Sequence, residues 1–169
     1  LGICSDDGAL PLMSRSPEQL LNPSQCQQNR LILASESPRR LDLLGQIQIL
    51  PDQIIPACID ETPHRNELPA DYALRMAVEK AGQIVDRLMD EYADSTGRTG
   101  STGPSGVYVL AGDTVVAAGR RILPKVETAQ EARGCLAILS GRRHRVYGGI
   151  ALHSLNGQLR YRLVQSHVR

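Results

Sequence analysis

One short stretch, Leu31–Arg40, constrains the fold of this chain more than any other. It opens with four apolar residues, the length of a short buried strand, and continues through two serines and Pro38 into Arg39 and Arg40. Proline costs little in the first turn of a helix, where its missing N–H would have no partner, and Ser37 before it suits an N-cap. The stretch therefore predicts a strand, a tight polar loop and a helix that begins with two arginines.

This arrangement favours an anion. Free N–H groups and the positive end of the helix dipole meet at a helix start, and arginine matches the geometry of phosphate oxygens. The candidate phosphate ligands are Ser35, Ser37, Arg39 and Arg40. An ordinary capped helix with solvated arginines is the alternative, and these residues alone leave both interpretations open. The loop is not a Walker A loop, because it lacks glycines and a Gly-Lys-Ser/Thr end.

Composition narrows the classes of function. The chain has 169 residues, enough for one domain with a core, and a net charge of +1. Phe and Trp are absent, which argues against base stacking on aromatic side chains. The near-neutral charge argues against general attraction of polyanions, so we expect no stable nucleic-acid complex. No apolar run approaches a membrane span, which predicts no membrane partner. Four cysteines without a CxxC pair or a secretion signal are typical of reduced thiols, and we expect a cytoplasmic protein.

The chain divides into two parts of unlike composition. Residues 1–30 are polar and turn-prone, and we expect a mobile tail. Residues 31–169 carry alternating strand and helix patterns, with a Gly- and Ser-rich surface insertion at 95–106. After the first strand and helix, strands are expected at 53–57, 107–118, 146–155 and 158–168, and helices at 69–89 and 127–139. The last two strands form a hairpin around Asn156-Gly157, and the helix at 127–139 should bury Ala132, Cys135, Leu136 and Leu139.

Polar residues interrupt three of these patterns. Asp113 and Thr114 lie inside an otherwise apolar run, where a carboxylate is costly unless it is paired or binds a metal ion or a water. A hairpin turn at this point is the alternative. Lys80 falls beside the apolar stripe of its helix, from which a lysine either snorkels outward or holds an anion in a cleft. Asp60-Glu61 follow a strand, where α/β proteins place chemistry, although a solvated turn has the same pattern.

Six motifs, in order along residues 31–169, resemble the Maf family of nucleoside triphosphate pyrophosphatases. They are ASESPRR with the helix LDLLGQI, ACIDETP, YALRMAVEKA, GDTVVA, ILPKVETAQEA and LSGRRHRVYGGIAL. The resemblance implies an α/β fold of the Maf/Ham1-like type: a mixed, twisted sheet flanked by helices, with two lobes and a central cleft. It also implies hydrolysis of a nucleoside triphosphate to the monophosphate and pyrophosphate with a divalent cation, Mg²⁺ or Mn²⁺. The SPRR sequence resembles the dTTP/UTP branch.

The resemblance also implies a role for each site residue. The triphosphate would be bound by polar and basic side chains: Ser35, Ser37, Arg39, Arg40, Lys80 and Lys125. The metal would be held by Glu61 and Asp113, and Asp113 would be the general base for the attacking water. Thr114, together with Arg39, would bear on the choice of base. Lys125 is flanked by Pro and Val where the family commonly has Gly and Pro, so the backbone that aims it is expected to differ.

Two further expectations and one alternative complete the prediction. The family continues past the position of Arg169 with Lys-Ala-Gly and Ile-Gln-Gly motifs that supply a glutamine for the base, so the resemblance implies that the C-terminal part of the domain is missing here. It also implies a homodimer. The alternative function is a nucleotide-binding regulatory protein without turnover, of the septum-formation inhibitor type.

Overall fold

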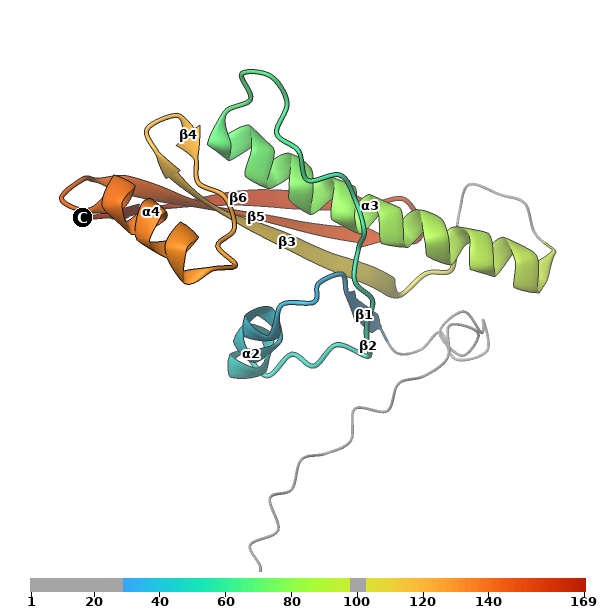
Figure 1. The fold of residues 1–169 in the computed structure, drawn as a ribbon. Helices are drawn as coiled ribbons and strands as arrows, with labels where there is room; N and C mark the ends of the chain where they lie inside the picture. Colours follow the sequence, from blue (N-terminus) through green and yellow to red (C-terminus); the bar gives the residue numbers. More distant parts are fainter. Residues whose placement is uncertain (1–28, 98–102) are drawn as a thin grey trace, which may run out of the picture.

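A computed structural model describes residues 29–97 and 103–169, which build a six-stranded mixed sheet with helices packed on it (Figure 1). The strand order is β2-β1-β3-β5-β6, and β4 pairs with the end of β3. β1 is parallel to β2 and β3, whereas β3, β5 and β6 are antiparallel neighbours. The elements are β1 (Arg30–Leu33), α2 (Pro38–Gln46), β2 (Gln53–Ile54), α3 (Pro69–Thr96), β3 (Val107–Ala118), β4 (Arg121–Ile122), α4 (Ala129–Leu139), β5 (His144–Ser154) and β6 (Leu159–Val168). The predicted mixed α/β fold is confirmed.

The central strand β3 settles one alternative. It is continuous over twelve residues, so the hairpin turn considered at Gly112-Asp113 does not occur. Val109, Ala111 and Val115 alternate along β3 and are buried. Because side chains alternate between the faces of a strand, Asp113 lies on the same face as these residues. The core therefore surrounds a carboxylate.

Helix α3 runs across one face of the sheet and supplies much of the core (Figure 1). It begins with Pro69, as predicted, and continues past residue 89 to a left-handed C-cap at Gly97. The extension occurs because no Gly or Pro lies between residue 89 and Gly97 and because Tyr92 adds another buried contact. Although α3 is long, neither it nor any other helix in the described ranges is apolar enough to cross a membrane.

Gly149 on β5 lets α3 approach the sheet closely. A Cβ at Gly149 would lie 2.1 Å from the carbonyl oxygen of Ala73, which belongs to the helix backbone and cannot move alone. We expect Gly149→Ala to lower the free energy of unfolding by about 3 kcal/mol, measured by urea denaturation, because α3 must shift. Gly148→Ala is the matched control, since its Cβ would be 4.0 Å from the nearest atom in the described part of the chain, the Val164 carbonyl oxygen. Equal stabilities of the two variants would contradict this packing.

The remaining strands agree with the sequence except for β2. The predicted hairpin is present as β5 and β6, with Gly157 in the turn at a φ of 91°. β2 covers only Gln53–Ile54 instead of 53–57. The chain leaves the sheet before Pro56, which has no N–H for a strand ladder.

Helix α4 forms where predicted but does not bury the predicted residues. Its N-terminus has a capping box between Thr128 and Glu131. The four residues expected to face a core do not do so, and Leu136 is 64% exposed. Ala132, Cys135 and Leu139 are only half-buried. The expectation was wrong because an amphipathic pattern predicts a helix with an apolar face but not how deeply that face is buried.

Two sequence predictions fall wholly or partly outside the described residues. The tail expected at 1–30 is described only from residue 29, and Arg30 is already the first residue of β1. Residues 98–102 of the surface insertion also lie outside the description.

Candidate active site

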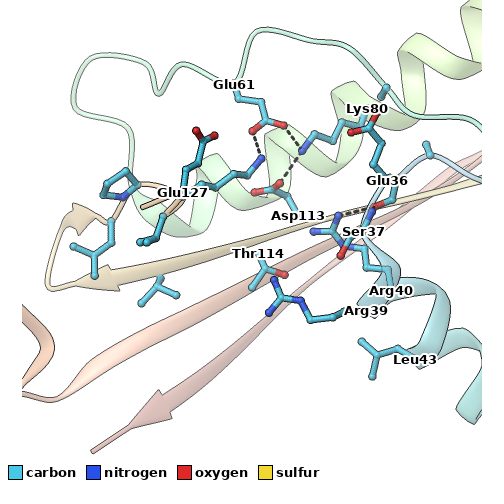
Figure 2. A pocket seen from close by; sticks show the side chains of 18 residues that line it. Glu36, Ser37, Arg39, Arg40, Leu43, Glu61, Lys80, Asp113, Thr114 and Glu127 are labelled. Atoms are coloured by element: carbon cyan, nitrogen blue, oxygen red, sulfur yellow. Dashed lines mark hydrogen bonds and ion pairs between the residues drawn. The ribbon is translucent and has the colours of Figure 1, made fainter. Parts of the chain in front are cut away.

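One cleft of about 850 Å³ gathers every candidate site residue (Figure 2). Its lining comes from the β1–α2 loop, α2, the segment before α3, α3 itself, β3 and the segment after β4. The candidates on its wall are Ser35, Ser37, Arg39, Arg40, Glu61, Lys80, Asp113, Thr114 and Lys125. The structure thus brings together residues far apart in sequence, while their individual roles stay predictions.

The β1–α2 loop has a polar side chain at its centre. Ser35 is buried, and its Oγ accepts hydrogen bonds from the Ser37 backbone N–H at 3.2 Å and from Arg40 Nη1 at 2.8 Å. Ser37 occupies the N-cap position of α2, but its hydroxyl makes no capping hydrogen bond in the described structure. Arg39 also lines the cleft from the first turn of α2 (Figure 2). Two guanidiniums and a helix N-terminus therefore lie on one wall, an arrangement that attracts anions.

Lys80 lies between two carboxylates on the opposite wall. Its Nζ is 2.8 Å from Asp113 Oδ1 and 2.8 Å from Glu61 Oε1. Lys125 Nζ lies 2.5 Å from the other oxygen of Glu61. Lys80 and Asp113 are each only 6% exposed, so Lys80 points into the cleft and does not snorkel outward. The two lysines balance the charge of the two carboxylates.

Glu61 is held in its anionic form. Burial raises its pKa, but hydrogen bonds from Lys125 and Lys80 outweigh that effect and leave the pKa below its ordinary value. Asp60 next to it is exposed, and its Oδ1 accepts the Thr62 N–H at 2.9 Å. Of the two adjacent carboxylates, it is Glu61, the one that the family resemblance implies as a site residue, that lines the cleft.

Sequence reasoning missed several residues at this site. Glu36 and Glu127 also line the cleft (Figure 2). Tyr72 of α3 donates a hydrogen bond from its hydroxyl to the Glu61 carbonyl at 2.6 Å. A tyrosine on the apolar stripe of a helix is typical of a core residue, so its spacing offered no sign of this contact. Glu127 lies two residues after Lys125, which was the only available hint.

Glu61 and Asp113 are carboxylates of the kind that hold a divalent cation. Within the described ranges, no three His, Cys, Asp or Glu side chains cluster as a metal site. Mg²⁺ commonly binds through one or two carboxylates together with substrate phosphates, not in an all-protein cage. Glu61 and Asp113 already place one oxygen each within 2.8 Å of a single cationic atom, Lys80 Nζ. The donor set therefore suits a hard cation.

A second ion pair, beside the site, predicts a pH effect on stability. Arg75 donates to Glu67 from Nε at 2.6 Å and from Nη2 at 2.8 Å, and these bonds lower the pKa of Glu67 from 4.5 to about 2. The folded pKa lies below the unfolded one, so the stabilisation is complete above about pH 4.5 and is lost as the pH falls toward 2. Between about pH 5 and about pH 3 we expect wild type to lose about 1–2 kcal/mol more unfolding free energy than Glu67→Gln.

Urea denaturation at both pH values measures this difference. Glu79→Gln is the matched control, because Glu79 also pairs with Arg75, at 3.2 Å, but its side chain is 44% exposed. Its pH dependence should stay close to that of wild type. If wild type and Glu67→Gln lost the same unfolding free energy between the two pH values, the Arg75–Glu67 pair would not be the cause of the loss of stability in acid.

The fold and the cleft define a mixed α/β protein in which two serines and two arginines face a carboxylate pair, and sequence comparison gives its family. Residues 30–169 match the model of the Maf-like proteins, and the chain belongs to the Maf family. A dTTP/UTP pyrophosphatase of Mesorhizobium japonicum is 52% identical over 140 residues, 83% of this chain and 62% of that protein. A dTTP/UTP pyrophosphatase of Brucella abortus is 51% identical over 142 residues, 84% of this chain and 64% of that protein. The chain spans less than two thirds of the length of these curated relatives.

Solved structures resemble the chain more distantly. The Ham1 protein of Staphylococcus aureus aligns with a TM-score of 0.47 and 12% identity, over 82% of this chain and 70% of that one. A nucleoside-triphosphatase, dITP/XTP pyrophosphatase, of Mycobacterium abscessus aligns with a TM-score of 0.41 and 17% identity, over 82% and 71%. Membership of the family therefore rests on the sequence.

Proposed function

We propose that this protein hydrolyses nucleoside triphosphates, dTTP and UTP in particular, to the monophosphate and pyrophosphate with Mg²⁺ or Mn²⁺. One observation carries the proposal: a single cleft places two serines of the β1–α2 loop and two arginines of the first turn of α2 opposite a carboxylate pair bridged by a buried lysine. The names of the two relatives, each a dTTP/UTP pyrophosphatase, support the same activity and the same bases.

The wall formed by the β1–α2 loop would bind the triphosphate. The start of α2 offers backbone N–H groups and the positive end of its dipole. Arg40 is already oriented by Ser35, so little side-chain freedom is lost when it binds an oxyanion. The full set of proposed triphosphate ligands is Ser35, Ser37, Arg39, Arg40, Lys80 and Lys125. Thr114 and Arg39 would contribute to the choice of base.

The opposite wall would carry out the hydrolysis. Glu61 and Asp113 would hold the divalent cation, which lowers the pKa of a bound water and neutralises phosphate charge. Asp113 would accept the proton of the attacking water as the α–β anhydride bond breaks. Lys80 and Lys125 would then loosen their ion pairs with Glu61 and Asp113. Their ammonium groups would offset the negative charge that develops on the departing pyrophosphate.

Pyrophosphate release from a panel of nucleoside triphosphates with Mg²⁺ tests the proposal. We expect release to be fastest with dTTP and UTP and to stop when EDTA removes the cation. Equilibrium binding of the same nucleotides is measured in parallel. Binding without release from any nucleotide would overturn the hydrolase proposal and leave a nucleotide-binding protein without turnover.

Two properties of the whole protein belong to the same proposal. We expect a homodimer, as the family resemblance implies, and light scattering of the purified protein measures its mass. We also expect the protein in the cytoplasm, in keeping with the free thiols of Cys58 and Cys135. Fractionation of cells checks the location.

A further inference from the structure

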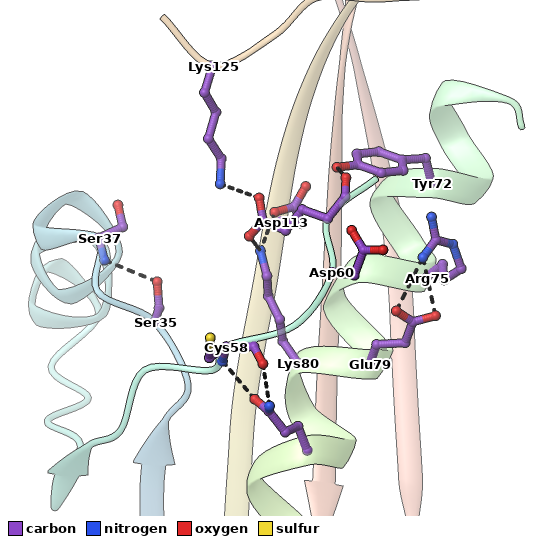
Figure 3. A network of polar contacts seen from close by, with 12 residues as sticks. Ser35, Ser37, Cys58, Asp60, Tyr72, Arg75, Glu79, Lys80, Asp113 and Lys125 are labelled. Carbon is purple, nitrogen blue, oxygen red and sulfur yellow. Dashed lines mark hydrogen bonds and ion pairs between the residues drawn. The ribbon is translucent and has the colours of Figure 1, made fainter. Parts of the chain in front are cut away.

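We propose that three side chains of α3, namely Tyr72, Arg75 and Gln83, act as positioning residues that hold Glu61 at the reacting centre. We call these three side chains the α3 clamp. Figure 3 shows Tyr72, Arg75 and Lys80 on this helix. The inference rests on the proposed function, because it assumes that Glu61 takes part in it.

The segment that carries Glu61 needs such support. Between β2 and α3, the described residues 55–68 contain neither helix nor strand. A segment without a hydrogen-bonded ladder is normally among the more mobile parts of a fold. A catalytic carboxylate, however, must be held to within a fraction of an ångström of its partners. Contacts from outside the segment must therefore fix it.

The α3 clamp supplies those contacts at three backbone positions, residues 58, 61 and 62. Gln83 binds both backbone groups of Cys58: its Oε1 accepts the N–H at 2.7 Å and its Nε2 donates to the carbonyl. The Tyr72 hydroxyl donates to the carbonyl of Glu61 itself. Arg75 Nη2 donates to the carbonyl of Thr62 at 3.1 Å. The backbone is thus held before, at and after Glu61.

The three clamp residues share one side of α3. Their positions differ by three and then eight residues, which places them along the same helix face, beside Lys80. One helix therefore fixes both Lys80 and the main chain of its partner Glu61. Burial, followed by the charges of Asp113 and Glu61, raises the pKa of Tyr72 to about 12, so its hydroxyl stays a donor near neutral pH. Arg75 also forms an ion pair with Glu67, near the end of the segment that leads into α3.

Tyr72→Phe is the sharpest test, because it removes one oxygen and leaves a ring that packs with Met76, Val115 and Tyr147. We expect kcat for dTTP to fall about tenfold while KM changes less than about threefold, since the proposed triphosphate ligands of the β1–α2 loop and of α2 are untouched. Backbone amides of residues 58–62 should exchange faster with deuterium, and those of α3 should not. Arg75→Gln should have the same two effects.

Two matched controls lie on the same helix. Tyr92→Phe alters a tyrosine that is 9% exposed, against 8% for Tyr72, but that lies about 30 Å further along α3. Arg87→Gln removes an arginine that pairs with Glu91, four residues on, at 3.0 Å. Both control variants should keep wild-type kcat and wild-type exchange in the segment.

A double variant separates positioning from a general structural effect. In a Glu61→Gln background, Tyr72→Phe should cause no further loss of kcat, because its effect passes through Glu61. A second tenfold loss in that background, or no loss in the single variant of an active wild type, would overturn the proposal. If wild type releases no pyrophosphate from any nucleotide, the proposed function fails by itself. In that case amide deuterium exchange tests the α3 clamp. Unchanged exchange at residues 58–62 in Tyr72→Phe overturns the proposed positioning role, and faster exchange supports it.

Discussion

Asp113→Asn is expected to lower kcat for pyrophosphate release about a thousandfold. Asn cannot accept a proton from water and carries no charge for a cation, whereas the proposed role of Asp113 needs both. The fold should persist, because the Asn side-chain oxygen can still accept the hydrogen bond that Lys80 makes to Asp113 Oδ1 at 2.8 Å. Release rates at saturating dTTP, with circular dichroism of both proteins, measure the effect.

Asp60→Asn is the matched control. It makes the same chemical change beside the cleft, at an exposed carboxylate whose contact is a local turn to the Thr62 N–H. Its activity should stay within about twofold of wild type, as for most surface substitutions. An Asp113→Asn protein that kept more than about a tenth of wild-type activity would show that Asp113 is not the general base.

Lys80→Met is expected to have the largest effect on stability at the site. Methionine keeps the unbranched stem among its buried neighbours but removes the ammonium that pairs with Asp113 and Glu61. Removing one partner of a buried pair leaves an uncompensated charge, so we expect a loss of about 3 kcal/mol in the free energy of unfolding. Pyrophosphate release should fall at least about a hundredfold, because both carboxylates lose their orientation. Urea denaturation and the release assay measure the two effects.

Lys125→Met tests whether burial is the cause. Lys125 also pairs with Glu61, but its side chain is 73% exposed, so its loss should cost less than about 1 kcal/mol. The double variant Lys80→Met with Asp113→Asn should regain part of the stability without regaining activity, since it no longer buries an unpaired carboxylate. Equal stability losses in Lys80→Met and Lys125→Met would contradict the burial argument.

Local patterns predicted the elements well where one physical rule was decisive. Pro38 and the apolar residues on either side of the loop placed β1 and α2. The long apolar run around Asp113 predicted the bounds of β3, although it left a hairpin turn at Gly112-Asp113 open. The desolvation cost of a buried carboxylate predicted a partner for Asp113. The Asn156-Gly157 turn placed the β5–β6 hairpin. Site candidates drawn from these motifs all line one cleft.

Other features depend on contacts between distant segments and could not be predicted. Whether Lys80 snorkels or turns inward depends on the depth of α3 over the sheet, which no pattern within the helix records. The local pattern left Asp60 and Glu61 equivalent, and only the family resemblance pointed to Glu61; the contact of its backbone with α3 comes from the fold. The α4 prediction failed for the same reason, because the periodicity of Leu136 and its neighbours predicts an apolar face but not what covers it.

The contact between Gly149 and the α3 backbone has a consequence for how this family can vary. Ala73 touches the sheet main chain to main chain, about two turns before Lys80. The distance from the helix to Asp113 is therefore set by two backbones and not by the bulk of the side chains between them. We expect neighbouring core residues such as Met76 and Val115 to tolerate exchange for other apolar residues without a change in the distance between Lys80 and Asp113. Substitutions among the apolar core residues would then leave the geometry of the site largely unchanged.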